Sequence, residues 1–438
     1  MKEGLKHHIV IVGGGAGGLE LATSLGRKLG KKKRAKITLI DASLTHIWKP
    51  LLHEVAAGSL DSGANEINFR AHAKRSHFNF QLGTMKGLNR ASKTISVAAI
   101  TDETGDLIVN EREIPYDSLV IAVGSNTNDF GTPGAAEHCR FLDTHDQAKR
   151  FHNILLNAFL KAEFQSENNE SHSLNIAIIG AGATGVELAA ELHFSAKELP
   201  NYGLSNLKKG DIQIHLIEAA PTILPALPKY LSDAATLELD ALGIQIKTGQ
   251  RVTGISQDSI SFENGETLKS SLSVWAAGIK APTFLADLDG LEHNRINQLC
   301  VTETLQTTED PNIFAIGDCA SCPRPGHAQS VPPRAQAAHQ QASLLSKSLK
   351  GILAGEAPLT FSYRDYGSFI SFSRYSAVGN LMGRLAGKNL MIEGRLARLF
   401  YISLYRMHQI ALFGFTRTGL IWLNDMFTKA LRTKLKLH

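Results

Sequence analysis

The chain has 438 residues, of which 43% are hydrophobic and 20% charged, with four cysteines and a formal net charge of +5. This length suits several domains, each with its own core, and four cysteines are too few for a disulfide-stapled secreted fold. Because no charge-free apolar run reaches the length of a membrane span, and no apolar signal segment opens the chain, we expect a cytoplasmic protein without transmembrane helices.

The first expected strand, residues 8–12 (HIVIV), leads into a glycine-rich turn and then a helix. The turn places Gly13, Gly15 and Gly18 at GxGxxG spacing. In this pattern the first glycine permits a tight turn, the second lets the backbone approach a pyrophosphate, and the third lets the helix pack against the strand. The next expected strand, KITLI, ends in Asp41, a carboxylate suited to accept hydrogen bonds from ribose hydroxyls. The segment therefore predicts a dinucleotide site.

A second copy begins at residues 175–179 (NIAII) and places Gly180, Gly182 and Gly185 in the same order. A single GxGxxG is a weak signal, but both copies here lie between an expected buried strand and a helix. The next strand, IQIHLI, ends in Glu218, and the longer interval before it predicts an insertion. A carboxylate there repels a 2′-phosphate, and the two alanines that follow provide no arginine to bind one. We therefore expect this site to prefer NADH over NADPH.

Three further segments run from an expected strand into a glycine: LVIAVG at 119–124, VWAAG ending at Gly278, and IFAIGD ending at Asp318. Two dinucleotide sites in one chain suggest two different dinucleotides that exchange electrons. IFAIGD resembles the segment by which two-dinucleotide flavoprotein oxidoreductases return to their FAD domain. The resemblance implies that Asp318 contacts the ribityl and pyrophosphate region, and that an NAD domain is inserted into the FAD domain.

The cysteines bear on the electron acceptor. Disulfide reductases of this architecture need a C-x4-C pair beside the flavin, and the corresponding stretch, 48–55 (WKPLLHEV), contains no cysteine. Cys319 and Cys322 form the only close pair, and with His327 they fall short of four zinc ligands. We expect a structural role for them and no metal site.

The segment 334–341 (RAQAAHQQ) resembles the quinone-site signature of type II NADH:quinone oxidoreductases. The chain length, both glycine patterns, WKPLLHE, GDCASCP and the basic tail are similar to that family as well, so the resemblance covers essentially the whole chain. It implies non-covalently held FAD, NADH as the donor and a membrane quinone as the acceptor. It also implies a homodimer attached to the cytoplasmic face of the cell membrane, with no nucleic-acid partner.

The resemblance also assigns roles to single residues. It implies that Lys49 places a cation near the pyrimidine end of the flavin and that Glu187 lies near the nicotinamide and flavin. Gln336 and His339 are three apart, so on a helix they share a face and both reach a quinone carbonyl, with the histidine suited to proton delivery. The implied FAD contacts are Gly13, Gly15, Gly18, Asp41, Lys49 and Asp318. The implied NADH contacts are Gly180, Gly182, Gly185, Glu218 and Gly278, and the implied catalytic residues are Glu187, Gln336 and His339.

The net positive charge lies in the tail, where residues 395–438 carry five arginines and three lysines against the single acid Asp425. As a helix, the start of this segment has an apolar stripe (Leu396, Phe400, Leu404, Met407 and Ala411) opposite a polar one (Arg395, Arg398, Arg406 and Gln409). This pattern is typical of a helix lying in a membrane interface, with Trp422 as a second interface residue. The alternative is that these helices form a dimer contact or cover the core.

Together these features predict an α/β fold with two Rossmann-like dinucleotide-binding domains, similar to glutathione reductase, followed by amphipathic helices that anchor the protein to a membrane. The predicted reaction is NADH + H⁺ + quinone → NAD⁺ + quinol, by two-electron transfer through FAD and without proton pumping. The expected divisions are an FAD-binding domain at 1–130 and 296–345, an NADH-binding domain at 131–295, and a C-terminal region at 346–438.

Three alternatives remain open from the sequence. A sulfide:quinone oxidoreductase shares the fold but needs cysteines flanking the flavin. A soluble NADH-dependent ferredoxin reductase needs neither the AQAAHQ segment nor a basic amphipathic tail. A non-catalytic NAD(H)-responsive protein binds the nucleotide without turnover.

Overall fold

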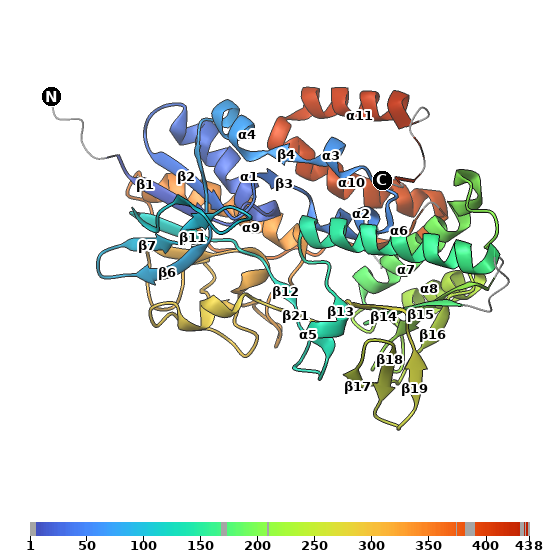
Figure 1. Ribbon diagram of the computed structural model, residues 1–438. Helices are drawn as coiled ribbons and strands as arrows, with labels where there is room; N and C mark the ends of the chain where they lie inside the picture. Colours follow the sequence, from blue (N-terminus) through green and yellow to red (C-terminus); the bar gives the residue numbers. More distant parts are fainter. Residues whose placement is uncertain are drawn as a thin grey trace.

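Two five-stranded parallel sheets organise the computed structural model, which describes residues 6–167, 173–207, 210–373, 375–381, 390–429, 433, 435 and 436. In Figure 1 the first sheet lies at the left and the second at the lower right. The first has the order β23-β11-β1-β2-β5 and the second β13-β20-β14-β15-β16. Their strands are β1 (His8–Val12), β2 (Lys36–Asp41), β5 (Asn79–Leu82), β11 (Ser118–Ile121) and β23 (Ile313–Ala315), then β13 (Cys139–Arg140), β14 (Leu174–Ile179), β15 (Ile212–Ile217), β16 (Gln245–Lys247) and β20 (Leu272–Trp275).

The strand sequences suit this arrangement, because every residue of β1 and β11 is buried. Parallel sheets are covered on both faces, so their strands are continuous apolar runs and not alternating ones. β23 pairs with β11, although the whole second sheet lies between them in sequence. The predicted α/β fold with two dinucleotide-binding sheets is therefore confirmed, and the segment after β23 returns to the first glycine turn.

Helices cover both sheets: α1 (Ala16–Leu25), α2 (Leu52–Ala57), α3 (Ser62–Asn65), α4 (Phe69–Ser76), α5 (Ala135–His138), α6 (His145–Glu167), α7 (Ala183–Glu198), α8 (Lys229–Ala241) and α9 (Ala335–Ile352). A short 3-10 helix, η3 (Leu199–Tyr202), occupies part of the expected insertion before β15. α1 and α7 each begin directly after the second glycine of a turn. A Cβ atom on Gly18 would lie 1.9 Å from the Gly13 carbonyl oxygen, and one on Gly185 1.9 Å from that of Gly180. Only glycine allows these helices to start so close to their strands.

Smaller antiparallel units complete the chain: β6 (Met85–Asn89), β7 (Thr94–Val97) and β10 (Arg112–Pro115); β17 (Val252–Ile255), β18 (Ser259–Phe262) and β19 (Thr267–Lys269); and β25 (Gly367–Phe372), β26 (Ser376–Leu381) and β27 (Leu390–Glu393). Two-stranded pairs join β3 (Thr45–His46) to β4 (Ile67–Asn68) and β12 (Asn126–Thr127) to β21 (Ile279–Lys280). The last helices, α10 (Gly394–Phe413) and α11 (Phe415–Lys429), are drawn in red at the top of Figure 1.

Each sheet has its own hydrophobic core, but the cores do not follow the chain order. α2 belongs to the first part of the sequence, yet Leu52 and Val55 are buried in the core of the second sheet, with α6 and α7. Phe372 of β25 joins that core as well. Conversely, Leu285 and Leu288 are buried in the core around the first sheet. These exchanges hold the two sheets against one another.

The C-terminal end of α10 is hydrogen-bonded to the segment that follows α1. Arg27, which follows α1 directly in the segment Gly26–Gly30, donates hydrogen bonds to the carbonyl oxygens of Ala411 and Leu412. A guanidinium there satisfies free carbonyls and complements the negative end of the helix dipole. Within the described ranges, no helix is both long and apolar enough to traverse a bilayer.

Candidate functional site

A cavity of about 1490 Å³ lies where the two glycine turns, α9 and α10 meet. Its lining contains eleven of the residues that the sequence singled out: Gly13, Gly15, Gly18, Asp41, Lys49, Gly182, Glu187, Gly278, Asp318, Gln336 and His339. Gly180, Gly185 and Glu218 are not among the lining residues: the two glycines belong to the second turn itself, and Glu218 accepts a hydrogen bond from its backbone. Residues far apart in sequence therefore share one space.

At the first turn, Asp41 accepts hydrogen bonds from the backbone N–H of Gly14 at 2.6 Å and of Ser43 at 2.8 Å. Burial raises the pKa of this carboxyl group. Gly15 precedes α1 in an ordinary extended conformation, and a Cβ atom there would meet nothing within 4 Å. The first amides of α1 thus face open cavity, which is the geometry of an anion site at a helix N-terminus.

The second turn repeats these contacts. Glu218 accepts hydrogen bonds from the backbone N–H groups of Ala181 and Ala220, both at 2.9 Å. Gly182 precedes α7 as Gly15 precedes α1, and a Cβ atom there would also meet nothing within 4 Å. A carboxylate accepts more than two hydrogen bonds, so Glu218 retains capacity for ribose hydroxyls.

Asp318 and Lys49 are linked through Ser125. The Ser125 hydroxyl donates to Asp318 Oδ2 at 2.9 Å, and Lys49 Nζ donates to the Ser125 carbonyl oxygen at 2.7 Å and to Asp143 Oδ1 at 3.3 Å. Burial raises the pKa of Asp318, and the Lys49 cation opposes that effect. The aspartate after β23 and the lysine before α2 therefore share one polar cluster on the cavity wall.

Glu187 is a buried acid near the start of α7. Its Oε1 accepts a hydrogen bond from the Ser371 backbone N–H at 3.1 Å, and its Oε2 lies 3.7 Å from Nδ1 of His53. Burial raises the pKa of Glu187 to about 8 and lowers the pKa of His53 to about 4. At neutral pH the pair is thus a carboxylic acid beside a neutral imidazole and not an ion pair. Tyr401 of α10 also lines the cavity, and its buried hydroxyl has no hydrogen-bond partner among the described residues.

Gln336 and His339 lie on α9 and both face the cavity, as their spacing predicts. The Gln336 amide is engaged with the segment before β25: it donates to the Gly367 carbonyl oxygen at 3.1 Å and to Asp365 Oδ1 at 3.4 Å, and it accepts from the Tyr366 N–H at 3.2 Å. Nδ1 of His339 lies 2.6 Å from a carboxylate oxygen of Glu20. Nε2 of His339 has no hydrogen-bond partner in the part of the chain that the structure describes.

The sequence reading missed Glu20, His46 and His408, which line the same cavity. The available signal was an acid inside the otherwise apolar helix AGGLELATSL, because a buried carboxylate requires partners. Its partners come from α9 and from α10, where His408 lies 388 residues later in the chain. No local pattern relates these positions.

The packing of α10 leaves its expected role as a lipid-facing helix a prediction. Leu404 and Met407 line the cavity, Gln409 is buried, and Arg406 binds Asp425 of α11 at 2.8 Å. Leu404 and Met407 of the apolar stripe therefore border the cavity, and Met407 is also 42% exposed. Arg395, Leu396, Arg398 and Phe400 lie outside the residues whose side chains are described.

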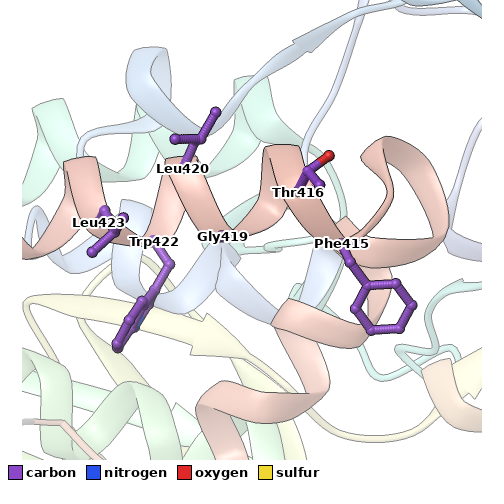
Figure 2. Close-up of a pocket in the computed structure, with 6 residues that line it drawn as sticks. All are labelled: Phe415, Thr416, Gly419, Leu420, Trp422 and Leu423. Carbon is purple, nitrogen blue, oxygen red and sulfur yellow. The ribbon is translucent and has the colours of Figure 1, made fainter.

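The exposed apolar face lies instead on α11. Figure 2 shows Phe415, Leu420, Trp422 and Leu423 around a shallow groove on this helix. Phe415 is 80% exposed and Leu420 66%, and Phe427 farther along is 73% exposed. Exposed apolar side chains grouped on one helix are typical of surfaces that bind a membrane or another protein.

The cysteines lie away from the cavity wall. Cys319 is buried and donates weakly to the carbonyl oxygens of Ile121 and Ile316, and burial raises the pKa of Cys319 to about 12 and that of Cys322 to about 11. Both therefore remain thiols, which bind metals poorly. Among the described lining residues there is no cysteine, and among the described residues no three potential ligands are grouped to hold a metal ion.

Two Rossmann-type sheets whose glycine turns open on one cavity, with an aspartate returning after the last strand, define an oxidoreductase that joins two dinucleotides. The family model for pyridine nucleotide-disulphide oxidoreductases matches residues 7–342. The chain belongs to this family and, within it, to the type II NADH:quinone oxidoreductases.

One relative places it there, and two solved structures share its fold. A type II NADH:quinone oxidoreductase from Haemophilus influenzae is 45% identical over 443 aligned positions, which cover 98% of this chain and 100% of that protein. The structure of NDH2 from Plasmodium falciparum in complex with NADH matches with a TM-score of 0.80 at 20% identity, covering 98% of this chain and 100% of that one. The sulfide:quinone oxidoreductase from Aquifex aeolicus matches with a TM-score of 0.71 at 17% identity, covering 98% and 96%, which shows the shared fold alone.

Proposed function

We propose that this protein oxidises NADH and reduces a membrane quinone to quinol through FAD, by two-electron transfer and without proton pumping. The observation that carries the proposal is the continuous cavity, because it joins both nucleotide turns to the helix that bears Gln336 and His339. The name of the Haemophilus influenzae relative supports the same activity.

The first turn fits FAD. The open space over Gly15 leaves room for a pyrophosphate at the N-terminus of α1, and Asp41 ends the neighbouring strand as a ribose acceptor. Asp318 would hold the ribityl and pyrophosphate region, and Lys49 would place a cation near the isoalloxazine ring. Bound FAD supplies the chemistry that accepts hydride from a nicotinamide and passes the electrons on to a quinone.

The second turn is proposed to bind NADH through Gly180, Gly182 and Gly185, with Glu218 on the ribose and Gly278 beside the nicotinamide half. Glu187, which is protonated at neutral pH, then holds a proton at the reacting face of the cavity. Its burial away from solvent keeps that proton in place until the reaction requires it.

The acceptor side is proposed to lie against α9. A quinone oxygen there accepts a hydrogen bond from Nε2 of His339. The same oxygen also replaces Asp365 as the acceptor of one hydrogen bond from the Gln336 amide. That exchange costs little, because the Gln336–Asp365 bond is long, at 3.4 Å. Trp48, Leu404 and Met407 supply an apolar wall for the quinone.

The test is a two-stage experiment with purified holoenzyme under anaerobic conditions. NADH should bleach the flavin absorbance, and a short-chain quinone added afterwards should restore it. Binding of NADH without bleaching favours the non-catalytic alternative. Bleaching by sulfide favours the sulfide:quinone alternative, and restoration by a ferredoxin but by no quinone favours the ferredoxin reductase.

Replacement of Glu218 by alanine should weaken the discrimination against NADPH. The carboxylate repels a 2′-phosphate, and its removal leaves no negative charge at the end of β15. We expect kcat/KM for NADPH to rise at least tenfold relative to that for NADH, since a single charge–charge interaction of about 1.4 kcal/mol is a tenfold change. Steady-state kinetics with both nucleotides measure the ratio, and an unchanged ratio would contradict the assigned role.

We further propose that α11 attaches the protein to the cytoplasmic face of the cell membrane, as a homodimer. Its exposed apolar face and the exposed Arg417 beside it suit a surface of anionic lipid. The four-part division at 1–130, 131–295, 296–345 and 346–438 is also proposed, with residues 281–295 packing on the first core although they fall within the second part.

A double change, Leu420→Asp with Phe427→Asp, should reduce cosedimentation with anionic vesicles at least tenfold. Each apolar side chain that is no longer buried in the lipid phase lowers the binding free energy by about 1.5 kcal/mol or more. The matched control is Leu237→Asp on α8, whose side chain is 70% exposed. Equal binding by the double variant and the control would contradict attachment through α11, and loss of the dimer instead of vesicle binding would assign this face to a second copy.

A further inference from the structure

Glu20 is a buried acid on α1 that lies between α9 and α10. Its Oε2 lies 2.6 Å from Nδ1 of His339, and its Oε1 lies 2.6 Å from Nδ1 of His408. Both carboxylate oxygens are thus taken by imidazoles from two other helices. These three residues, Glu20, His339 and His408, are called the carboxylate–imidazole triad below.

The triad continues to the first glycine turn. Nε2 of His408 lies 3.0 Å from Nε2 of His46, and Nδ1 of His46 lies 2.8 Å from the Gly14 carbonyl oxygen. A carbonyl only accepts, so Nδ1 of His46 carries a hydrogen. Burial lowers the pKa of His46 to about 3, so this ring is neutral and its Nε2 accepts the hydrogen bond from His408.

This hydrogen-bond inventory fixes the number of protons. Nε2 of His408 donates to His46, and a proton also lies between Nδ1 of His408 and Glu20. Glu20 and His408 together therefore hold one proton more than a carboxylate and a neutral imidazole, so the pair has no net charge. Trp48 stacks on the His408 ring, with centroids 6.1 Å apart and planes inclined by 14°.

His339 is the member of the triad that meets the cavity. Its Nδ1 donates to Glu20, and its Nε2 is left for a ligand. The hydrogen bond to Glu20 raises the pKa of His339, although burial opposes it. The other titratable or charged groups near the triad are His72 of α4, whose field acts on His46, and the cations Arg27, Arg75 and Arg417, which act on His72.

We propose that Glu20 is a positioning residue for the quinone half of the reaction: it orients His339 with Nε2 toward the cavity and keeps that nitrogen protonated, while His408 balances its charge. This inference rests on the proposed function. When the electron pair reaches the quinone, the N–H bond at Nε2 breaks and an O–H bond forms on a quinone oxygen. His339 is left neutral, with its Nδ1–H still on Glu20. The reaction takes one proton from solution besides the hydride hydrogen, and this is the proton that His339 delivers.

The substitution Glu20→Gln separates charge from geometry. The Gln carbonyl oxygen accepts from Nδ1 of His339, and its NH₂ donates to an unprotonated Nδ1 of His408, whose Nε2–H still donates to His46. Every hydrogen bond of the triad is retained, but the negative charge and the extra proton are lost. The variant therefore keeps His339 oriented and lowers its proton affinity.

The experiment mixes NADH-reduced holoenzyme with a short-chain quinone in a stopped-flow instrument over a range of pH. In the wild-type protein, fast reoxidation should persist to higher pH than in Glu20→Gln, because Glu20 favours the protonated imidazole. At pH 8 the variant's ratio of quinone reoxidation rate to flavin reduction rate should fall about tenfold or more. His408→Asn, whose amide still donates to Glu20, removes a positive charge from the triad and should move the pH midpoint upward.

Opposite shifts of the pH midpoint in the two variants support the proposal, and they are not expected from structural damage. The matched control is Glu163→Gln, a buried acid that accepts backbone N–H bonds from Asn206 and Leu207 and should leave both rates unchanged. In the His339→Asn variant, adding Glu20→Gln should not lower the quinone reoxidation rate further, because Glu20 acts through the His339 ring.

Two outcomes would overturn the inference: equal slowing of both half-reactions in Glu20→Gln, or an unaltered pH midpoint in both variants. If Glu20→Gln does not retain flavin, the pH midpoint of His408→Asn still tests the inference. A downward shift or no shift would contradict the proposal that His408 balances the charge of Glu20. Failure of the wild-type protein to be reduced by NADH or reoxidised by quinone would instead refute the proposed function.

Discussion

Gly15→Val is expected to yield a folded protein that contains no flavin. The backbone at Gly15 is extended, with φ −65°, and a Cβ atom there would meet nothing within 4 Å, so valine fits the fold without strain. Its two methyl groups would fill the space over the α1 N-terminus, where we place the pyrophosphate. The measurement is flavin content of the purified protein by absorbance, with circular dichroism to establish that it is folded.

Gly182→Val is the reciprocal variant and the control. Its backbone is equivalent, with φ −71° and free space around the Cβ position, but it lies at the second turn. This protein should retain its flavin, whereas NADH should bleach that flavin with an apparent dissociation constant raised at least a hundredfold, or about 2.7 kcal/mol. If both variants lose flavin, or if the effects are exchanged, the assignment of the two turns is wrong.

Glu187→Gln is expected to make the protein more stable and less active. The pKa of Glu187 is raised from 4.5 to about 8, so the folded state binds a proton that the unfolded state releases between those values. The raised pKa therefore lowers the free energy of unfolding. The loss is absent below about pH 4.5, grows as pH rises, and reaches about 3 kcal/mol near pH 7. Gln resembles the protonated acid and retains an acceptor for the Ser371 N–H, so the penalty disappears.

The functional cost of that change follows from the same proton. An amide can neither release nor regain a proton, so quinone turnover should fall about a hundredfold if Glu187 gives its proton to one quinone oxygen and regains it from the hydrogen that left NADH, while His339 delivers the proton taken from solution. Thermal unfolding from pH 5 to pH 8 measures the effect on stability. The unfolding temperature of the wild-type protein should fall over this range, and that of the variant should not. Glu163→Gln is the control, because its carboxylate accepts two backbone N–H bonds and gains nothing from an amide. Unchanged turnover with increased stability would assign Glu187 to packing alone.

Features that depend on neighbouring residues could be predicted from the sequence. β1 and the turn at Gly13 follow from a five-residue apolar run and a glycine spacing, and the same local signal recurs at β14 and Gly180. The return of Asp318 to the first sheet was implied by the resemblance of IFAIGD to the corresponding segment of flavoprotein oxidoreductases, and β23 pairs with β11 there. Local backbone sterics and burial on both sheet faces determine such features, so they are readable in a window of a few residues.

The amphipathic pattern of α10 was read correctly as a helix, but its apolar side was assigned to lipid. A helical wheel shows that the apolar side of a helix is buried against something, but it does not show whether the partner is lipid, another chain or the protein's own core. Leu404 and Met407 line the cavity, and Arg27 binds the end of the helix, whereas α11 carries several exposed apolar side chains. The partner of a surface depends on packing between distant segments.

The sequence by itself determined the two nucleotide turns and the α/β class, because each rests on short-range spacing of glycines, apolar residues and acids. It indicated the family through the resemblance of short segments such as RAQAAHQQ to those of known members. Only the tertiary structure decided that Glu20 joins His339 to His408, that Gln336 is bound to the segment before β25, and that Glu187 is a protonated acid. Proton affinity depends on burial and on charges within a few ångströms, and those neighbours come from segments hundreds of residues apart.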